Sequence, residues 1–405
     1  MPEIIAWKAV DSFKLNYTDS KLIISRPCPI CGSHNSAVFF QVPDFQFYSD
    51  SERLPKRVNI SQRFCSECNC IFMNPCYSET GSGILFQEAG ASYGAPLWRY
   101  EDRVAWLLSN IEFKESMTVL DLGCHDGFML SLLPKHVKKI GADIDHNILK
   151  KAKKKCPDIT FICGDIERLS FSSDIDLITI FHVLEHVRKP TLLLRNLLKF
   201  VNDETILAVE VPVLEHGNCH DINSFFSVHH LTHFTIRSIT HCLTTAGWKT
   251  IRCKKVKEKG GYRLLARPGS TKVIDWMTNY DDDRCLLYEY LSNFYKCLQK
   301  TAKKMTGWEI DKFCVIWGAG SHTELLYKLT PFFRLSSMTR YIIVDNDSNK
   351  WGKTWRGINI YSPRVLDQID WTKTNLIISS YGSQESIAKE AMERGIEEDR
   401  IIKLY

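Results

Sequence analysis

Two closely spaced pairs of cysteines near the beginning of the chain could bind a metal ion. Each pair has the spacing C-x-x-C, and the four residues are Cys28, Cys31, Cys65 and Cys68. Two such turns can supply the four thiolates of a tetrahedral zinc site, and a small, loop-rich segment often needs such an ion to fold. Because sulfur would fill every coordination position, we predict a structural rather than a catalytic zinc ion. Cys70 and Cys76 are competing ligands, and ordinary buried cysteines are the alternative.

A glycine turn further along the chain could bind a cofactor. The stretch from Val119 to Gly127 reads V-L-D-L-G-C-H-D-G, which predicts an apolar strand, a tight turn at Gly123 and a helix over 128–133. Glycine lets the backbone approach a ligand closely at the beginning of a helix. The spacing differs from the G-x-G-x-x-G pattern of dinucleotide enzymes, which disfavours an NAD site.

Polar residues end the predicted strands that follow this turn. Asp143 ends I-G-A-D about 20 residues later, where a carboxylate can accept hydrogen bonds from both hydroxyls of a ribose. Asp165 follows Cys163 and Gly164, where a carboxylate can meet an adenine amino group, and His182 begins H-V-L-E-H. We therefore predict one cofactor site formed by Asp121, Gly123, Cys124, Gly127, Asp143, Asp165 and His182.

Histidines gather after the fourth and fifth predicted strands. His186 ends L-E-H, and His229, His230 and His233 lie within S-V-H-H-L-T-H. Imidazole titrates near neutral pH, so a histidine beside the cofactor could act as a general base. For any one of them a hydrogen-bonding or helix-capping role is the alternative. A metal site at His229 and His233 is a further alternative, because they have i, i+4 spacing.

The elements that must position these residues alternate between strands and helices. The strands are expected at 119–122, 139–143, 160–163, 177–181 and 206–211. This alternation implies right-handed βαβ units in a parallel, doubly wound α/β sheet, whose ligands lie at the carboxyl ends of the strands. We divide the chain into a zinc-binding region (1–80), this domain with a helical lead-in (81–266), a helical connector (267–311) and a C-terminal Rossmann-like α/β domain (312–405).

The C-terminal domain begins with a second glycine turn. Gly318-Ala-Gly320 follows a predicted strand and precedes a helix over 323–329, and Asp345 ends the next strand. Glycines at the beginning of a helix can hold a phosphate, so this turn could contribute to a nucleotide-sugar site. A structural or dimer-forming role is the alternative. The third glycine of the dinucleotide pattern is missing, which disfavours a dinucleotide.

Composition limits the classes of partner. The 405 residues carry a net charge of +5, with 44% hydrophobic and 24% charged residues, which is typical of a soluble globular protein. The mild charge disfavours a nucleic-acid partner, and no apolar run approaches the ~20 residues that cross a bilayer, so no membrane partner is expected. Lysines at 150–155 are expected on a solvated helix face. Without an apolar export signal, fifteen cysteines favour a reduced, cytoplasmic location, and the oligomeric state stays open.

The cofactor motifs together resemble class I methyltransferases. The D-x-G turn at Asp121 and Gly123, the strand end at Asp143, the Gly164-Asp165 pair and the L-E-H after the fourth strand follow one another in that family's order. The resemblance implies that the cofactor is S-adenosyl-L-methionine and that the protein is a methyltransferase. A relative that has lost catalysis is the alternative.

The order of the parts resembles a narrower family, the sugar C-methyltransferases of deoxysugar biosynthesis. These have a zinc-binding N-terminal region, a methyltransferase core and a C-terminal α/β domain. The resemblance implies C-methylation of a nucleotide-linked 4-keto-6-deoxy sugar, with His230 as the base that forms an enolate. It also implies active-site roles for His186, His229 and Tyr93. Ser227 and His229 replace a Tyr and a Glu of the family, which leaves the methylated atom open.

Other functions remain compatible with these residues. An O- or N-methyltransferase acting on a sugar or another small molecule needs only a base and alignment. An RNA methyltransferase with a zinc knuckle is disfavoured by the mild charge. A non-catalytic nucleotide-sugar-binding protein would keep the fold but transfer no methyl group.

Overall fold

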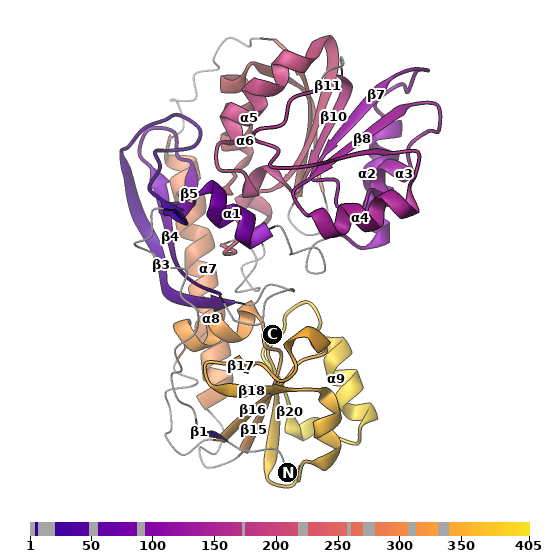
Figure 1. The fold of residues 1–405 in the computed structure, drawn as a ribbon. Coiled ribbons are helices and arrows are strands. Elements are labelled where there is room, and N and C mark those ends of the chain that lie inside the picture. Colours follow the sequence, from indigo (N-terminus) through magenta and orange to yellow (C-terminus); the bar gives the residue numbers. More distant parts are fainter. Residues whose placement is uncertain are drawn as a thin grey trace.

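The computed structural model describes residues 5–6, 21–47, 56–86, 94–171, 175–217, 226–256, 261–269, 280–306, 313–330 and 340–405. Figure 1 shows a large α/β unit at one end of the molecule and a smaller one at the other. A long hairpin and a long helix lie between them. Among the helices of the described residues, none combines the length and the apolar character needed to cross a bilayer.

The larger unit contains a seven-stranded sheet in the order β13-β14-β11-β10-β7-β8-β9. Its strands are β7 (Thr118–Leu122), β8 (Lys138–Asp143), β9 (Thr160–Cys163), β10 (Ile175–Phe181), β11 (Val201–Pro212), β13 (Trp248–Lys255) and β14 (Gly261–Pro268). The five expected strands are parallel, whereas β14 is antiparallel to both β11 and β13. Sequence analysis missed β13 and β14. Most of β13 is polar and exposed, so its apolar pattern is weak.

Helices cover both faces of this sheet. Val119 points toward α2 (Leu97–Leu108), α3 (Phe128–Ser131) and α4 (His146–Lys155), and packs in one apolar core with them. Leu120 points the other way and packs with α5 (Pro190–Leu197) and α6 (Ile236–Ala246). Because successive side chains of a strand face opposite sides, both neighbours are buried and the strand reads as a continuous apolar run. The α/β fold expected for the central domain is confirmed.

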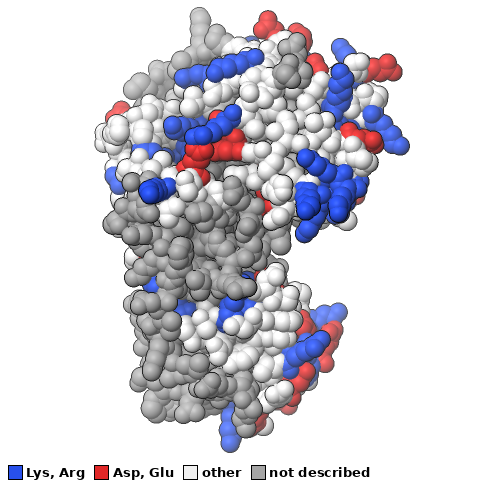
Figure 2. Space-filling model, viewed as in Figure 1, with Lys and Arg blue, Asp and Glu red and all other residues white. Residues whose placement is uncertain are grey.

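The lysine run lies on α4, as expected for a solvated helix face. Its five lysines are exposed, whereas Leu149 and Ala152 face the sheet. Figure 2 shows basic side chains gathered on the part of the surface where α4 lies. Because these lysines form one helix face and not a continuous groove, they give no independent sign of a nucleic-acid partner.

The N-terminal region is richer in strands than its sequence indicated. β3 (Ser36–Phe47) and β4 (Lys56–Cys65) form a long antiparallel hairpin that continues through β5 (Ile71–Met73) to β12 (Thr232–His233). Its apolar residues pack against α7 (Tyr280–Thr306) and the C-terminal unit in one core. The short strands β2 (Ile23–Ile24) and β6 (Cys76–Tyr77) pair beside α1 (Glu79–Phe86). Strand β12 therefore ties the histidine-rich segment to this region.

The C-terminal unit contains a second, mostly parallel sheet with the order β17-β18-β16-β15-β19-β20, in which β17 is antiparallel to β18. Its elements are β15 (Phe313–Trp317), α8 (Ser321–Leu329), β16 (Arg340–Val344), β17 (Thr354–Trp355), β18 (Ile358–Tyr361), β19 (Thr374–Ile378), α9 (Gln384–Glu393) and β20 (Ile401–Lys403), and β1 (Ile5–Ala6) pairs with β16. Buried Arg356 binds Glu324 of α8 and donates to the carbonyl oxygen of Asp44 at 2.6 Å. The hydrogen bond from Arg356 to Asp44 thereby joins the hairpin to the C-terminal unit.

Candidate active site

One cavity of about 380 Å³ lies at the carboxyl ends of β7, β8, β9 and β10. The turn after β7 forms one wall. Gly123 has φ +76°, and a Cβ there would lie 2.2 Å from Cγ2 of Val183. Both the backbone conformation and the close approach therefore require glycine. Gly127 begins α3 at φ +73° and packs under Phe161, outside the lining of the cavity.

Asp143, at the end of β8, lines the same cavity. Its carboxylate accepts the backbone N–H of His125 at 2.9 Å and that of Asp145 at 3.0 Å, which fixes its orientation. Burial raises the pKa of Asp143. Cys124 and Asp121 also line the cavity. Burial raises the pKa of Asp121 to about 7, and the Thr179 hydroxyl donates to its carboxylate at 2.6 Å. A backbone that approaches closely and a fixed carboxylate fit a nucleoside cofactor.

Asp165 also lines the cavity, but an arginine already binds its carboxylate. Arg188 lies 2.5 Å from Asp165 and 2.6 Å from Glu167. Arg26, from the N-terminal region, donates to the carbonyl oxygens of Arg188 and Leu231. An adenine contact at Asp165 therefore has to share the carboxylate with Arg188. Sequence analysis gave Arg188 no role, because its partners are distant in the chain.

The histidines fall into two groups. His186, His229 and His230 line the cavity, and the rings of His186 and His230 lie 5.0 Å apart. His233 is buried on β12, where its Nε2 lies 2.8 Å from Oε1 of Gln62, and it does not line the cavity. The alternative of a metal bound by His229 and His233 is therefore wrong. Tyr93 lies outside the described residues.

Phe86 of α1 brings the N-terminal region into the cavity. Its ring centroid lies 5.6 Å from that of His186 and 6.1 Å from that of His229. Nδ1 of His186 lies 2.9 Å from the carbonyl oxygen of His229, and this contact requires a proton on that nitrogen. The packing and the hydrogen bond together fix the orientation of the His186 ring.

Glu185 is a buried carboxylate beside these histidines. Its side chain is 1% exposed, and neither carboxylate oxygen has a hydrogen-bond partner. Nδ1 of His182 lies 3.3 Å from Oε1, and Nε2 of His186 lies 3.9 Å from it. Burial raises the pKa of Glu185, but the neighbouring imidazoles of His182, His186 and His230 lower it to about 2. The cavity therefore has a negative charge in its wall.

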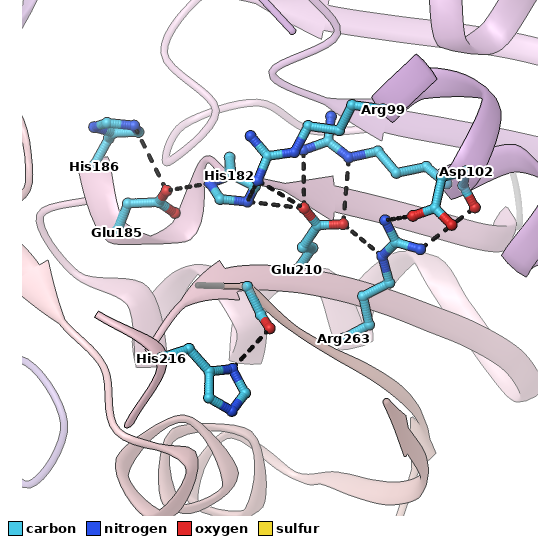
Figure 3. Close-up of polar contacts among 10 residues, drawn as sticks. Arg99, Asp102, His182, Glu185, His186, Glu210, His216 and Arg263 are labelled. Atoms are coloured by element: carbon cyan, nitrogen blue, oxygen red, sulfur yellow. Dashed lines mark hydrogen bonds and ion pairs between the residues drawn. The ribbon is translucent and has the colours of Figure 1, made fainter. Parts of the chain in front are cut away.

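A second buried carboxylate, Glu210 at the end of β11, is surrounded by cations (Figure 3). Arg103 lies 3.2 Å from it, Arg263 lies 2.5 Å from it, and Nε2 of His182 lies 2.8 Å from it. Burial raises the pKa of Glu210, but His182, Arg103 and Arg263 hold it well below its usual range. Arg99 lies 3.5 Å from Glu210. The only sequence signal was a glutamate inside an apolar strand.

This cluster places positive charge in the cavity wall. Arg99 and Arg103 of α2 line the cavity, and Arg99 also lies 2.8 Å from Nε2 of His182. Arg263 uses its remaining donors on Asp102, at 2.6 Å. Three guanidinium groups therefore share Glu210 and Asp102, and two of them, those of Arg99 and Arg103, line the cavity. An anionic group of a ligand would be stabilised there.

The four cysteines of the two C-x-x-C turns lie together. Their sulfur atoms are all within 4.8 Å of one another, with 3.5 Å between Cys28 and Cys68 and 3.6 Å between Cys31 and Cys65. A tetrahedral zinc site with Zn–S distances of about 2.3 Å has its sulfur atoms about 3.8 Å apart. Cys70 and Cys76 are outside this group, and each faces a backbone carbonyl. The donor set fits zinc and excludes the two competing cysteines.

The C-terminal turn borders a separate cavity of about 430 Å³. It is lined by Gly318, Gly320, Asp345 and Ser379 among others, at the carboxyl ends of β15, β16 and β19. Asp345 accepts the N–H of Ala319 at 2.7 Å and binds Lys350 at 3.2 Å. Its carboxylate is thus occupied by groups of the protein itself.

Comparisons with known proteins agree with the fold. A family model described as a methyltransferase domain matches residues 98–252, and one described as C2185-like, N-terminal matches residues 310–402. The malonyl-(acyl-carrier protein) O-methyltransferase of Priestia megaterium is 36% identical over 76 residues, 18% of this chain and 28% of that protein. The trans-aconitate 2-methyltransferase of an Azoarcus species is 26% identical over 109 residues, 26% of this chain and 43% of that protein. The chain thus spans less than half the length of either relative.

Two solved structures that match the chain each cover less than half of it. One is a putative methyltransferase in complex with the Trm112 methyltransferase activator of Haloferax volcanii, at TM-score 0.37 and 14% identity, covering 42% of this chain and 93% of that one. Another is an S-adenosylmethionine-dependent methyltransferase from Clostridium acetobutylicum, at TM-score 0.36 and 12% identity, covering 44% and 93%.

The family match, the curated relatives and the strand order define the central domain. A five-stranded parallel sheet extended by an antiparallel pair, with a glycine turn after its first strand and an acidic residue after its second, is a class I methyltransferase domain. The chain therefore contains an S-adenosyl-L-methionine-dependent methyltransferase domain. The close backbone approach at Gly123 and the fixed carboxylate of Asp143 fit that cofactor.

Proposed function

We propose that the protein transfers the methyl group of S-adenosyl-L-methionine to a small molecule, at an atom that first loses a proton. The observation that carries this proposal is the position of His186 and His230, which line the same cavity as Gly123 and Asp143. The cofactor supplies an electrophilic methyl group. The protein's contribution is to align the acceptor atom with that group and to accept the proton.

The substrate class that we propose is a nucleotide-linked 4-keto-6-deoxy sugar, methylated at carbon. The keto group acidifies the neighbouring C–H bond, and His230 takes that proton. The enolate is stabilised by the positive charge in the cavity wall.

Methylation of an oxygen in an anionic small molecule is the second candidate, and Arg99 and Arg103 favour it. Both line the cavity, and guanidinium groups bind carboxylates well. The curated relatives carry names that describe O-methylation of malonyl-acyl carrier protein and methylation of trans-aconitate. A carboxylate acceptor needs no base, so this candidate predicts little effect of replacing His230.

A panel of substrates separates these candidates. The protein is incubated with methyl-labelled cofactor and either nucleotide-linked 4-keto sugars or dicarboxylic acids, and the methyl position in the product is determined by NMR. Methyl on the carbon next to the keto group supports the first candidate, and a methyl ester supports the second. A protein that binds the cofactor and labels neither set contradicts both.

We also propose a structural zinc ion at the four cysteines of the C-x-x-C turns, supported by their sulfur separations. The segment between the two turns is the β3–β4 hairpin. A zinc ion would fix the open end of this hairpin and thereby help to hold Arg26 against the carbonyl oxygens of Arg188 and Leu231. The ion itself would take no part in methyl transfer.

A further inference from the structure

We propose that Glu185, His186 and His230 bind one divalent metal ion in the wall of the active-site cavity. One ligand atom from each lies within 4.8 Å of the others, and all three residues line the cavity. Glu185 and His186 come from the turn η1 (Leu184–His186) after β10, and His230 comes from the segment before β12. The main-chain N–H of Leu231 donates to the carbonyl oxygen of Glu185 at 2.8 Å, which fixes the two segments together.

The carboxylate of Glu185 is the first reason. It is buried, and both of its oxygens lack a hydrogen-bond donor. Native proteins rarely leave a buried charge in this condition unless an ion or a ligand completes it. Its near ion partner is Nδ1 of His182, 3.3 Å from Oε1, whereas Arg99 binds His182 and Glu210, and Arg103 binds Glu210.

The orientation of His186 is the second reason. Its Nδ1 donates a proton to the carbonyl oxygen of His229 at 2.9 Å, so in the neutral ring the lone pair is on Nε2. That nitrogen lies 3.9 Å from Oε1 of Glu185. A cation between this nitrogen and the carboxylate can accept a lone pair from each of them. Two ligands that are each about 2.1 Å from one ion can be up to about 4.2 Å apart, so the separation fits a shared ion.

The donor set indicates the kind of ion. Two imidazoles and one carboxylate suit a transition-metal ion such as Mn²⁺, Fe²⁺ or Zn²⁺ better than Mg²⁺ or Ca²⁺, which prefer oxygen ligands. Three protein ligands leave coordination positions that face the cavity. An oxygen of the substrate can occupy one of them, and the ion would stabilise negative charge on that oxygen.

This inference takes the identity of the substrate from the proposed function. It gives His230 a different role. A nitrogen that binds an ion accepts no proton. The ion would instead acidify the substrate by binding its keto oxygen. As the C–H bond breaks, the proton passes to His229, which also lines the cavity, and the electron pair forms the enolate. His230 is then a ligand rather than the base.

Manganese titration of the intact protein tests the site. Mn²⁺ is chosen because it binds nitrogen and oxygen in preference to a four-sulfur site, so zinc at the cysteines stays in place. Free Mn²⁺ is measured by electron paramagnetic resonance after loosely bound ions are removed with a chelator. We expect one Mn²⁺ per chain, and a loss of affinity of about tenfold or more in Glu185→Gln and in His186→Ala.

His136→Gln is the matched control, because His136 is exposed and lies far along the chain from the site. It should bind Mn²⁺ like the wild type. Cofactor titration by calorimetry shows that each variant is folded. Absence of stoichiometric Mn²⁺ binding, or equal binding by wild type and both variants, overturns the inference. Mn²⁺ binding without any methyl transfer would overturn the proposed function and leave the metal site standing. Full methyl-transfer activity of a metal-free enzyme would overturn the metal site and leave the proposed function standing.

Discussion

Replacing Gly123 by alanine should damage the cofactor site by two separable effects. The first is the backbone conformation, since φ +76° costs an L-residue about 1–2 kcal/mol relative to glycine. The second is the overlap between the new Cβ and Val183, which are 2.2 Å apart. Relief of such an overlap in a packed site costs about 1–3 kcal/mol, so we expect a total loss of about 2–5 kcal/mol. Because Val183 lines the cavity, cofactor affinity should fall as well.

Gly352→Ala is the control that isolates the first effect. Gly352 has φ +75°, and a Cβ there would meet nothing within 4 Å. Urea unfolding gives the stability loss of each variant, and calorimetry gives the affinity for S-adenosyl-L-methionine. We expect Gly352→Ala to lose only the conformational part and to bind the cofactor normally. A second substitution, Val183→Ala, should restore much of the loss in Gly123→Ala. If the two glycine variants lose the same stability and keep the same affinity, the close approach at Gly123 has no role in the site.

The remaining site predictions concern the zinc ligands, the cofactor carboxylate and the base. Cys28→Ser should lower the zinc content measured by metal analysis and destabilise the hairpin region, because binding and folding are coupled in such sites; a folded wild type without zinc would refute this. Asp143→Ala should weaken cofactor binding by about 1–3 kcal/mol in calorimetry, and equal affinities would show that the cofactor lies elsewhere. If His230 is the base of the proposed function and not a metal ligand, His230→Ala should lower turnover by about 10²–10⁴-fold and abolish exchange of the sugar's acidic proton with deuterated water, while cofactor binding persists. Surviving exchange would assign the base to another residue.

The cofactor side of the site could be predicted because the residues that form it lie close together in the sequence. Strand, turn and helix at 118–131 follow one another without a gap, and each has its own pattern of residue types. The α/β fold follows from the repetition of that pattern. Gly123 and Asp143 could be chosen because they occupy the two strand ends that such a sheet brings together.

The substrate side could not be predicted, because its partners are far apart in the chain. Glu210 is 107 residues from Arg103 and 53 from Arg263. It meets Arg263 only because β11 pairs with β14, a strand that was not predicted. His233 shows the same limit in reverse. The sequence placed it beside His230, but pairing of β12 with β5 turns it toward Gln62. A histidine's neighbours in the sequence therefore say little about the cavity it faces.

The two buried glutamates differ in how their charges are balanced, and Glu210 should be the one that stability depends on. Glu210→Gln leaves Arg103 and Arg263 buried without their counter-charge, which typically costs about 3–5 kcal/mol. Glu204→Gln is the matched control. Glu204 is on the same strand and binds Arg267 of β14 at 3.1 Å, but it is exposed, so its replacement should lower the free energy of unfolding by less than about 1 kcal/mol.

The pKa of Glu210 is held well below its usual range, so the stability that its charge contributes is complete above the unfolded pKa of 4.5 and is lost as the pH falls toward the folded value. The stability difference between wild type and Glu210→Gln in urea should therefore shrink below pH 4.5. Equal losses for the two variants at pH 7 would mean that the guanidinium groups around Glu210 are held in place by packing and not by its charge.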